Sequence, residues 1–384
     1  MSIIGAVIAW VALGLVLYVY IGYPLLLWVL SRIYHREVHQ APTTPSVTLL
    51  ISAFNEAEVI KEKLENSVAL DYPRERLEVL VISDASTDET DRIVQSFSGN
   101  GVVLLRMPQR RGKTMGLNAA MKVASGEIVV FSDANIMYRL DAVRKLVQSF
   151  ADPTVGCVTG DSRYLDQPDS VAHVQENSYW GYERFVRTLE SKIGSTVGGD
   201  GAIFAIRREL YTPLLPDMIN DLVVPLQIVV KGHRAIFEPQ AVGLEPSAGD
   251  FKREFRRKRR IVNRSWRGVM AVGDVLNPFK VKVFAWQVWS HKVLRWLVLP
   301  FVSMAALGCL AAYPLGWLYQ VGAWGFLGSL ILAGVGAVAP PCLGPISRLT
   351  HIIFYFYLVN LAALLGVLRA LAGRVEAVWV PERG

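Results

Sequence analysis

Three apolar runs of this sequence each end in side chains that carry oxygen ligands. The clearest run ends at Phe131 and is followed by Asp133 and Asn135, two residues apart. The two earlier runs are followed by Asn55, Glu56 and Asp84. Carboxylate and carboxamide oxygens suit hard cations such as Mg²⁺ and Mn²⁺, and an anionic crevice holds an anionic diphosphate only if a cation bridges them. Asp133 and Asn135 are therefore candidate metal ligands, with capping of the turn after the strand as the structural alternative.

Two glycine-based ways of holding a phosphate are absent from the sequence. A dinucleotide fold needs glycines after its first strand, and that position reads SAFNEAE at 52–58. The run RRGKT at 110–114 ends like a phosphate-binding loop, but Met107 stands where that motif needs glycine. We therefore expect the polar residues that follow these apolar runs to hold a ligand through carboxylates and a cation.

Strand and helix patterns alternate along the middle of the chain. Short apolar runs are followed by segments of helical periodicity, such as those at 57–70 and 112–124. This alternation predicts an α/β fold with a mainly parallel, Rossmann-like sheet. Ligands of such sheets lie beyond the carboxyl ends of the strands, where the connections change direction. Asn55, Asp84 and Asp133 are all predicted at that edge.

Both ends of the chain are strongly apolar. The chain has 384 residues, of which 52% are hydrophobic and 19% charged. Ile3–Leu30 contains no Lys, Arg, Asp or Glu and exceeds the ~20 residues needed to cross a bilayer. Further spans are predicted at Val293–Tyr313, Trp317–Ala339 and Ile352–Leu371. We expect an anchor at 1–31, a globular domain at 41–250, about three spans within 293–372 and a tail at 373–384.

Basic residues near the predicted spans indicate the orientation. Arg32 and Arg36 follow the first span, and Lys292 and Arg295 stand at the second. Basic residues prefer the cytoplasmic side, so the middle domain is predicted to be cytoplasmic in a multi-pass protein of the cell inner membrane. Arg369 conflicts with an even number of spans, and an interfacial segment would remove the conflict.

A basic stretch at 252–267 holds nine Lys or Arg in sixteen residues. Charge alone is typical either of a nucleic-acid-binding surface or of a helix lying on anionic lipid. Helical spacing puts Trp266 among apolar residues on one side and Arg260 and Arg264 on another. We therefore predict amphipathic interfacial helices at 251–292, contact with membrane lipids, and no nucleic-acid partner.

Several motifs, in a fixed order, carry a family resemblance. They are SAFNEAE, SDASTDET, GKTMGLNAA, GGDGAIFAIRREL and MINDLVVPLQIVVKGHRA. Together with the spans, they resemble the membrane-bound family 2 glycosyltransferases of the cellulose synthase, hyaluronan synthase and poly-N-acetylglucosamine synthase kind. The resemblance covers residue 47 to about 270 and implies a GT-A fold at 41–250, with hexosyltransferase activity.

The resemblance also implies residue roles. The residues that bind the nucleotide sugar would be Asn55, Glu56, Asp84, Lys113 and Asp133. Asp221 takes the place of the base that removes the proton from the acceptor hydroxyl, with a helix N-cap as the structural alternative. Mg²⁺ or Mn²⁺ at Asp133 and Asn135 would stabilise the departing diphosphate. The residues that contact the acceptor or the diphosphate would be Asp200, Gly201, Arg260, Arg264 and Trp266.

Two details qualify these roles. Asn263-Arg264-Ser265-Trp266 departs from the family motif, in which Arg and Trp are adjacent, so we make no prediction of processive synthesis. Trp266 has the alternative role of an anchor at the membrane interface.

The sequence thus predicts an inverting transfer from a nucleotide-diphosphate sugar, expected to be UDP-linked. The predicted acceptor is a lipid-linked saccharide or a growing exopolysaccharide or cell-envelope glycan at the cytoplasmic membrane face. Transfer directly onto polyprenyl phosphate or a ceramide-like lipid needs the same crevice and stays open. A rival, a non-catalytic nucleotide-binding membrane protein, would show no metal-dependent reaction of a nucleotide sugar. Polysaccharide export or polymerisation proteins are the expected partners.

Overall fold

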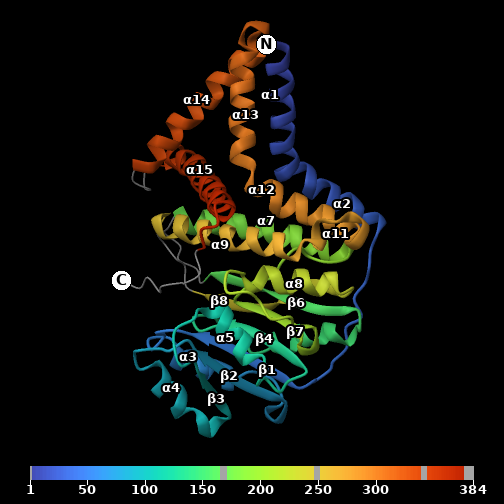
Figure 1. Ribbon diagram of the computed structural model, residues 1–384, viewed down its shortest axis with the longest axis vertical. Coiled ribbons are helices and arrows are strands. Elements are labelled where there is room, and N and C mark those ends of the chain that lie inside the picture. Colours follow the sequence, from blue (N-terminus) through green and yellow to red (C-terminus); the bar gives the residue numbers. More distant parts are fainter. Residues whose placement is uncertain (1, 165–170, 246–250, 339–343, 376–384) are drawn as a thin grey trace.

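The computed structural model describes residues 2–164, 171–245, 251–338 and 344–375. A domain built around a sheet lies at one end, and long apolar helices extend from the other (Figure 1). The helices at the boundary between these parts are α7 (Val171–Ile193), α9 (Phe251–Val272), α10 (Pro278–Val281) and α11 (Val283–Val288).

In the described residues, eight strands form a single mixed sheet. They are β1 (Val47–Ala53), β2 (Leu77–Ser83), β3 (Val102–Arg106), β4 (Ile128–Asp133), β5 (Met137–Tyr138), β6 (Val155–Tyr164), β7 (Ile203–Arg207) and β8 (Arg234–Glu245). The order is β3-β2-β1-β4-β7-β6-β8-β5. β1 pairs in parallel with β2 and β4, whereas β7 is antiparallel to β4 and β6. The predicted α/β class with a parallel-rich sheet is confirmed.

The strand order creates the edge at which the polar residues meet. β1 lies between β2 and β4, so the connections change direction beside it. The carboxyl ends of these three parallel strands therefore share one edge. Because β7 is antiparallel to β4, its first residue, Ile203, pairs with Ser132. The segment before β7, with Asp200 and Gly201, is thereby brought to the same edge as Asp133.

Side chains that alternate along the strands give the sheet two buried faces. The helices that cover it are α3 (Ile60–Val68), α4 (Thr90–Ser96), α5 (Lys113–Ala120), α6 (Ala142–Val147) and α8 (Asn220–Val230). Leu49 and Ile51 pack in a cluster with α3, α4 and α6. Leu50 and Phe131 pack on the other face with α5 and α8, where the Phe131 ring stacks on Phe204 at 4.4 Å between centroids.

Three helical segments in the described part of the chain are long and apolar enough to cross a membrane: Ser2–Ile33, Trp317–Val338 and Ser347–Leu371. Their helices are α1 (Ser2–Leu17), α2 (Tyr23–Ile33), α14 (Trp317–Val338) and α15 (Gly344–Leu371). The span predicted at Val293–Tyr313 overlaps a bent pair of helices, which could form one broken span. Val283–Trp296, which contains α11 and α12 (Leu294–Trp296), meets α13 (Val298–Ala311) at 65°.

Small residues bring α13 directly against α1, beside which it runs in Figure 1. A Cβ atom added to Gly5 would lie 2.6 Å from the Cβ of Ala311. A Cβ added to Gly308 would lie 2.6 Å from the backbone nitrogen of Ala9. Close backbone approach of this kind is typical of helix packing in membranes.

Helix α9 is packed on two sides. Gly268 leaves no room for a Cβ against Val223 of α8, and a Cβ on Gly366 of α15 would lie 2.7 Å from the carbonyl oxygen of Arg259. The Asn263 side chain donates to the Gly366 carbonyl at 3.3 Å. The basic helix predicted at a membrane surface therefore also joins the sheet domain to the C-terminal apolar helix.

Candidate active site

Asn55 ties the end of β1 to the loop that follows β2. Its backbone is left-handed, with φ of 51°, and its N–H donates to Ser86 Oγ at 3.2 Å. Its side-chain oxygen accepts the N–H of Thr87 at 2.8 Å. Glu56 is buried beside it, and its N–H donates to Thr90 Oγ1 at 2.8 Å. These contacts fix the segment after β1 against the loop after β2. Contact of Asn55 and Glu56 with a nucleotide stays a prediction.

Asp84 organises the approach to α5. Its side chain is buried, and its two oxygens accept the N–H groups of Arg111 and Gly112, each at 2.8 Å. Gly112 has a φ of 86°, a conformation that glycine adopts without strain. The next residue, Lys113, begins α5. Asp84 therefore sets the position of Lys113, while its contact with a base or ribose stays a prediction.

Lys113 forms an ion pair with Asp133 at the end of β4. Both side chains are about one-third exposed, so the pair is open to solvent. Asn135 lies in the turn after β4, partly buried. In the described residues no three His, Cys, Asp or Glu side chains cluster to hold a metal. The Asp133 carboxylate and the Asn135 amide oxygen fit a cation such as Mg²⁺, which proteins hold through one or two carboxylates together with substrate phosphates.

Lys63, a fully buried residue of α3, was not among the residues predicted from the sequence. Its Nζ donates to the carbonyl of Ile136 at 2.7 Å and lies 4.0 Å from the centroid of the Tyr138 ring. Burial lowers the pKa of Lys63 to about 7, and the nearby Asp133 carboxylate opposes this shift. Lys63 thus supports the turn that carries Asn135. Its position three residues after buried Ile60 could have placed it on the inner helix face.

Tyr138 connects the two halves of the edge. Its hydroxyl lies 3.0 Å from the carbonyl oxygen of Phe131 and 2.9 Å from that of Ala202. Phe131 stands just before Asp133, and Ala202 just after Gly201. The hydroxyl therefore holds the end of β4 against the start of β7.

Asp221 lies in the first turn of α8, and its carboxylate lies against Gly201. Its Oδ1 is buried and has no hydrogen-bond partner among the described residues, and no hydrogen bond joins its Oδ2 to another described residue. A Cβ on Gly201 would lie 2.9 Å from Asp221 Oδ2, so only glycine fits there without a shift. Burial raises the pKa of Asp221; Asp200 and Asp133 add to this effect and Lys113 opposes it. Ile219 occupies the N-cap position without a side-chain cap, so the N-cap interpretation of Asp221 is wrong.

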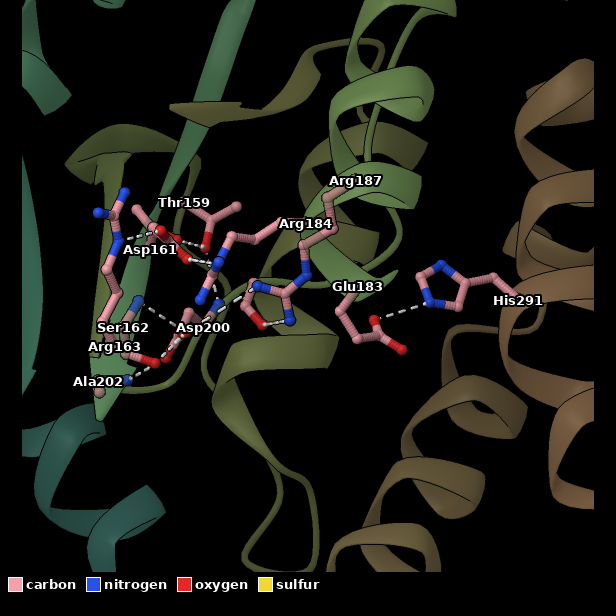
Figure 2. Close-up of polar contacts among 12 residues, drawn as sticks. Thr159, Asp161, Ser162, Arg163, Glu183, Arg184, Arg187, Asp200, Ala202 and His291 are labelled. Atoms are coloured by element: carbon pink, nitrogen blue, oxygen red, sulfur yellow. Dashed lines mark hydrogen bonds and ion pairs between the residues drawn. The ribbon is translucent and has the colours of Figure 1, made fainter. Parts of the chain in front are cut away.

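Asp200 holds the backbone beside Asp221. Its Oδ2 accepts the hydroxyl of Ser162 at 2.6 Å, and its Oδ1 accepts the N–H of Ala202 at 3.2 Å. Arg187 of α7 places Nη1 4.0 Å from Asp200 Oδ2. Both side chains are drawn in Figure 2. The carboxylate is buried, and these contacts orient Gly201 toward Asp221. An acceptor contact of Asp200 or Gly201 stays a prediction.

The structure brings Arg264 to the site and turns Trp266 elsewhere. The buried guanidinium of Arg264 donates to Thr114 Oγ1 at 2.6 Å and to the carbonyl of Met218. Burial lowers its pKa, and Asp221 and Asp217 oppose this. The Trp266 ring lies 6.0 Å from that of Trp296 and packs against an apolar cluster, and its contact with an acceptor stays a prediction. Arg260, one turn earlier on α9, is partly exposed.

Comparisons with known proteins agree with this architecture. Residues 48–214 match the family model of Glycosyl transferase family 2. The chain is 27% identical over 202 residues to poly-beta-1,6-N-acetyl-D-glucosamine synthase of Staphylococcus aureus, covering 51% of this chain and 48% of that protein. It is 26% identical over 235 residues to the synthase of Staphylococcus epidermidis, 56% of each chain. The chain thus spans about half the length of the curated relatives it matches.

A solved structure matches nearly the whole chain. The mannosyltransferase PcManGT from Pyrobaculum calidifontis, in complex with GDP-Man and Mn²⁺, has a TM-score of 0.69 and 28% identity. The match covers 95% of this chain and 99% of that one. The chain therefore carries a family 2 glycosyltransferase domain with a GT-A fold, as the resemblance implied.

Proposed function

We propose that the chain is an inverting glycosyltransferase that moves a sugar from a nucleotide-diphosphate sugar to an acceptor hydroxyl at a membrane. The observation that carries the proposal is the Asp221 carboxylate, which has a buried oxygen without a hydrogen-bond partner in the part of the chain that the structure describes. The charges of Lys113 and Asp133 interact electrostatically with this carboxylate. The guanidinium of Arg264 interacts with it in the same way. A candidate base and a set of cationic groups for a diphosphate thus share one edge.

The chemistry divides between the two sides of this edge. Asp221 takes the proton from the acceptor hydroxyl, whose oxygen attacks the anomeric carbon opposite the leaving diphosphate and inverts it. Burial raises the pKa of Asp221, which makes its carboxylate a better proton acceptor. Lys113 and Arg264 supply positive charge toward the leaving group. Asp133 and Asn135 would hold Mg²⁺ or Mn²⁺, which neutralises charge on the diphosphate.

The remaining donor residues are assigned by position. Asn55, Glu56 and Asp84 line the wall next to Lys113, and we assign the base and ribose to this wall. The family 2 relatives of Staphylococcus, which make a polymer of N-acetylglucosamine by name, support a UDP-linked donor. The mannosyltransferase solved with GDP-Man covers more of the chain and makes GDP-mannose the alternative donor.

We place the reaction at the cytoplasmic face of the inner membrane, with a lipid-linked saccharide or a growing glycan as acceptor. The support is the set of helices long enough to span a bilayer and the basic residues that flank them. Direct transfer onto a lipid such as polyprenyl phosphate remains the second candidate, because the apolar helices adjoin the sheet domain (Figure 1). Export or polymerisation proteins are the partners we expect.

The test is incorporation of label by membranes that contain the full chain. Radiolabelled UDP-sugars and GDP-mannose are supplied separately with Mn²⁺, with Mg²⁺ or with a chelator. Label is then divided between organic-soluble lipid and polymer. We expect transfer from one donor, dependent on the cation and absent from membranes of Asp221→Asn. A chain that only binds nucleotides would give no incorporation above that variant with any donor.

A further inference from the structure

A buried polar group joins α7 to the helices that lead into the membrane-spanning segments. His291, between α11 and α12, places Nδ1 2.8 Å from Glu190 Oε1 and Nε2 3.1 Å from Glu183 Oε2. The three side chains are at most 3% exposed. Figure 2 shows Glu183 turned from α7 toward His291. Neither this group nor His291 has a part in the chemistry proposed above.

The contacts of this group extend beyond its three members. Each ring nitrogen of His291 faces a carboxylate oxygen, so the ring bridges Glu183 and Glu190. Arg295 donates to Glu183, and the Tyr23 hydroxyl of α2 donates to Glu190. Burial alone would raise the pKa of each carboxyl, but Arg295 and His291 hold the pKa of Glu183 well below its usual range. His291 likewise holds the pKa of Glu190 below its usual range.

The second oxygen of Glu190 reaches the segment that lies against the proposed base. Glu190 Oε2 accepts the N–H of Val197 at 2.9 Å and the hydroxyl of Thr196 at 3.0 Å. One turn away on the same helix face, Arg187 donates to the carbonyl of Gly199 at 3.4 Å. Helix α7 therefore holds the 196–201 segment at both its beginning and its middle.

The same segment is in contact with Asp221. The N–H of Gly199 donates to the backbone carbonyl of Asp221 at 2.5 Å. Gly201 lies directly against the Asp221 carboxylate. A shift of the 196–201 segment would therefore move the groups that surround the base, while the Asp84–Lys113 wall would keep its own contacts.

We propose that His291 is a positioning residue for sugar transfer: by fixing Glu190, it holds the 196–201 segment against Asp221. The position of the base then depends on the bent helix that enters the apolar region. This inference rests on the proposed role of Asp221. Removing the imidazole leaves both buried glutamates without their bridging partner, so Glu190 moves and releases Thr196 and Val197.

The test compares His291→Phe with a matched variant, His351→Phe, in the full chain. His351 is also buried, but its ring bonds to the Ser347 carbonyl of its own helix, α15, at 2.7 Å. Because a misplacement near 1 Å costs ~100-fold in rate, we expect kcat of His291→Phe to fall ~10-fold to 100-fold. The KM for the nucleotide sugar should stay within ~2-fold, because the donor wall is untouched. His351→Phe should change neither constant.

Amide hydrogen exchange supplies a readout independent of activity. Exchange at Val197–Gly201 should accelerate in His291→Phe and not in His351→Phe. Thr196→Val is a second variant that disturbs folding less than His291→Phe. It removes one hydrogen bond to Glu190 and should lower kcat ~2-fold to 10-fold. Unchanged exchange at 196–201, or a loss of donor affinity equal to the loss in kcat, would overturn the proposal. Full activity of Asp221→Asn would instead contradict the proposed role of Asp221 as the base. Faster exchange in His291→Phe would still show that His291 holds the 196–201 segment.

Discussion

On the proposed donor side, formed by Asn55, Asp84, Lys113 and Asp133, acidic and amide groups already have partners, whereas the proposed base, Asp221, keeps one buried oxygen without a partner among the described residues. Asp84 accepts two backbone N–H groups, and Asp133 is paired with Lys113. Asp221 Oδ1 has no partner in the described part of the chain. The donor side is a wall held by its own hydrogen bonds, and the base side keeps an acceptor available for a proton.

The difference has an energetic meaning. A buried polar atom without a hydrogen bond costs ~1–3 kcal/mol, so it persists only where the surrounding structure enforces it. Here Gly201 lies directly against the carboxylate, and contacts of its segment with Arg187 and Glu190 hold it there. We therefore expect substitutions on the base side to affect the rate and those on the donor side to affect binding and metal dependence.

The largest effect should come from Asp221→Asn, which removes the base with little change of shape. We expect kcat to fall ~10²-fold to 10⁴-fold, the contribution of a general base. Nucleotide-sugar binding to solubilised protein should be retained. Asp217→Asn is the control, because Asp217 lies in the same region and pairs with Arg267. A loss of nucleotide-sugar binding as large as the loss of kcat in Asp221→Asn would indicate a structural role for this residue. The two sides would then not differ as proposed.

Asp133→Ala should show the opposite pattern. Loss of the carboxylate leaves Lys113 without its ion-pair partner and removes the proposed metal ligand. We expect transfer to fall ~10²-fold, with loss of Mn²⁺-dependent nucleotide binding measured by calorimetry. Asp71→Ala, in an exposed pair with Arg144, should leave both unchanged. Retained metal-dependent binding in Asp133→Ala would remove this residue from the metal site.

The sequence allowed much of the donor side to be predicted, because its information is local. An apolar run followed by a polar residue marks a strand end, and parallel strand ends share an edge. Asp84, Asp133 and Lys113 are at that edge as expected. The contacts of Asp84 with backbone amides were not predictable, since the sequence does not show which donors a buried carboxylate will meet.

The base side depends on contacts between distant parts of the chain. Glu183 and His291 are 108 residues apart, and no spacing in the sequence connects them. The bend between α12 and α13 likewise has no signal in hydropathy, because both segments are apolar. Trp266 was placed on the correct helix, yet its packing on Trp296 depends on where a separate helix lies.

Gly201→Ala tests the contact that keeps the base side tight. The added methyl would lie 2.9 Å from Asp221 Oδ2, so the carboxylate must shift. We expect kcat to fall ~10-fold to 100-fold with unchanged donor affinity, as for a small displacement of a catalytic group. Gly181→Ala on α7 is the control, because its Cβ would meet nothing within 4 Å. Wild-type kcat in Gly201→Ala would show that the site adapts and that the packing is not required.

The smallest effect concerns stability and pH. Burial raises the pKa of Asp221 above its unfolded value, so ionisation of this carboxyl costs the folded state free energy. The cost is absent below the ordinary Asp pKa of about 4, grows as pH rises through the folded pKa, and is fully present above it. Asn is neutral throughout, so Asp221→Asn should be more stable than wild type by on the order of 1 kcal/mol at neutral pH, and equal to it in acid. Unfolding midpoints measured in detergent from acid to neutral pH check this. A stability difference that does not change with pH would show that the pKa of Asp221 is not raised in the folded protein. Its unpartnered oxygen would then be hydrogen-bonded to water.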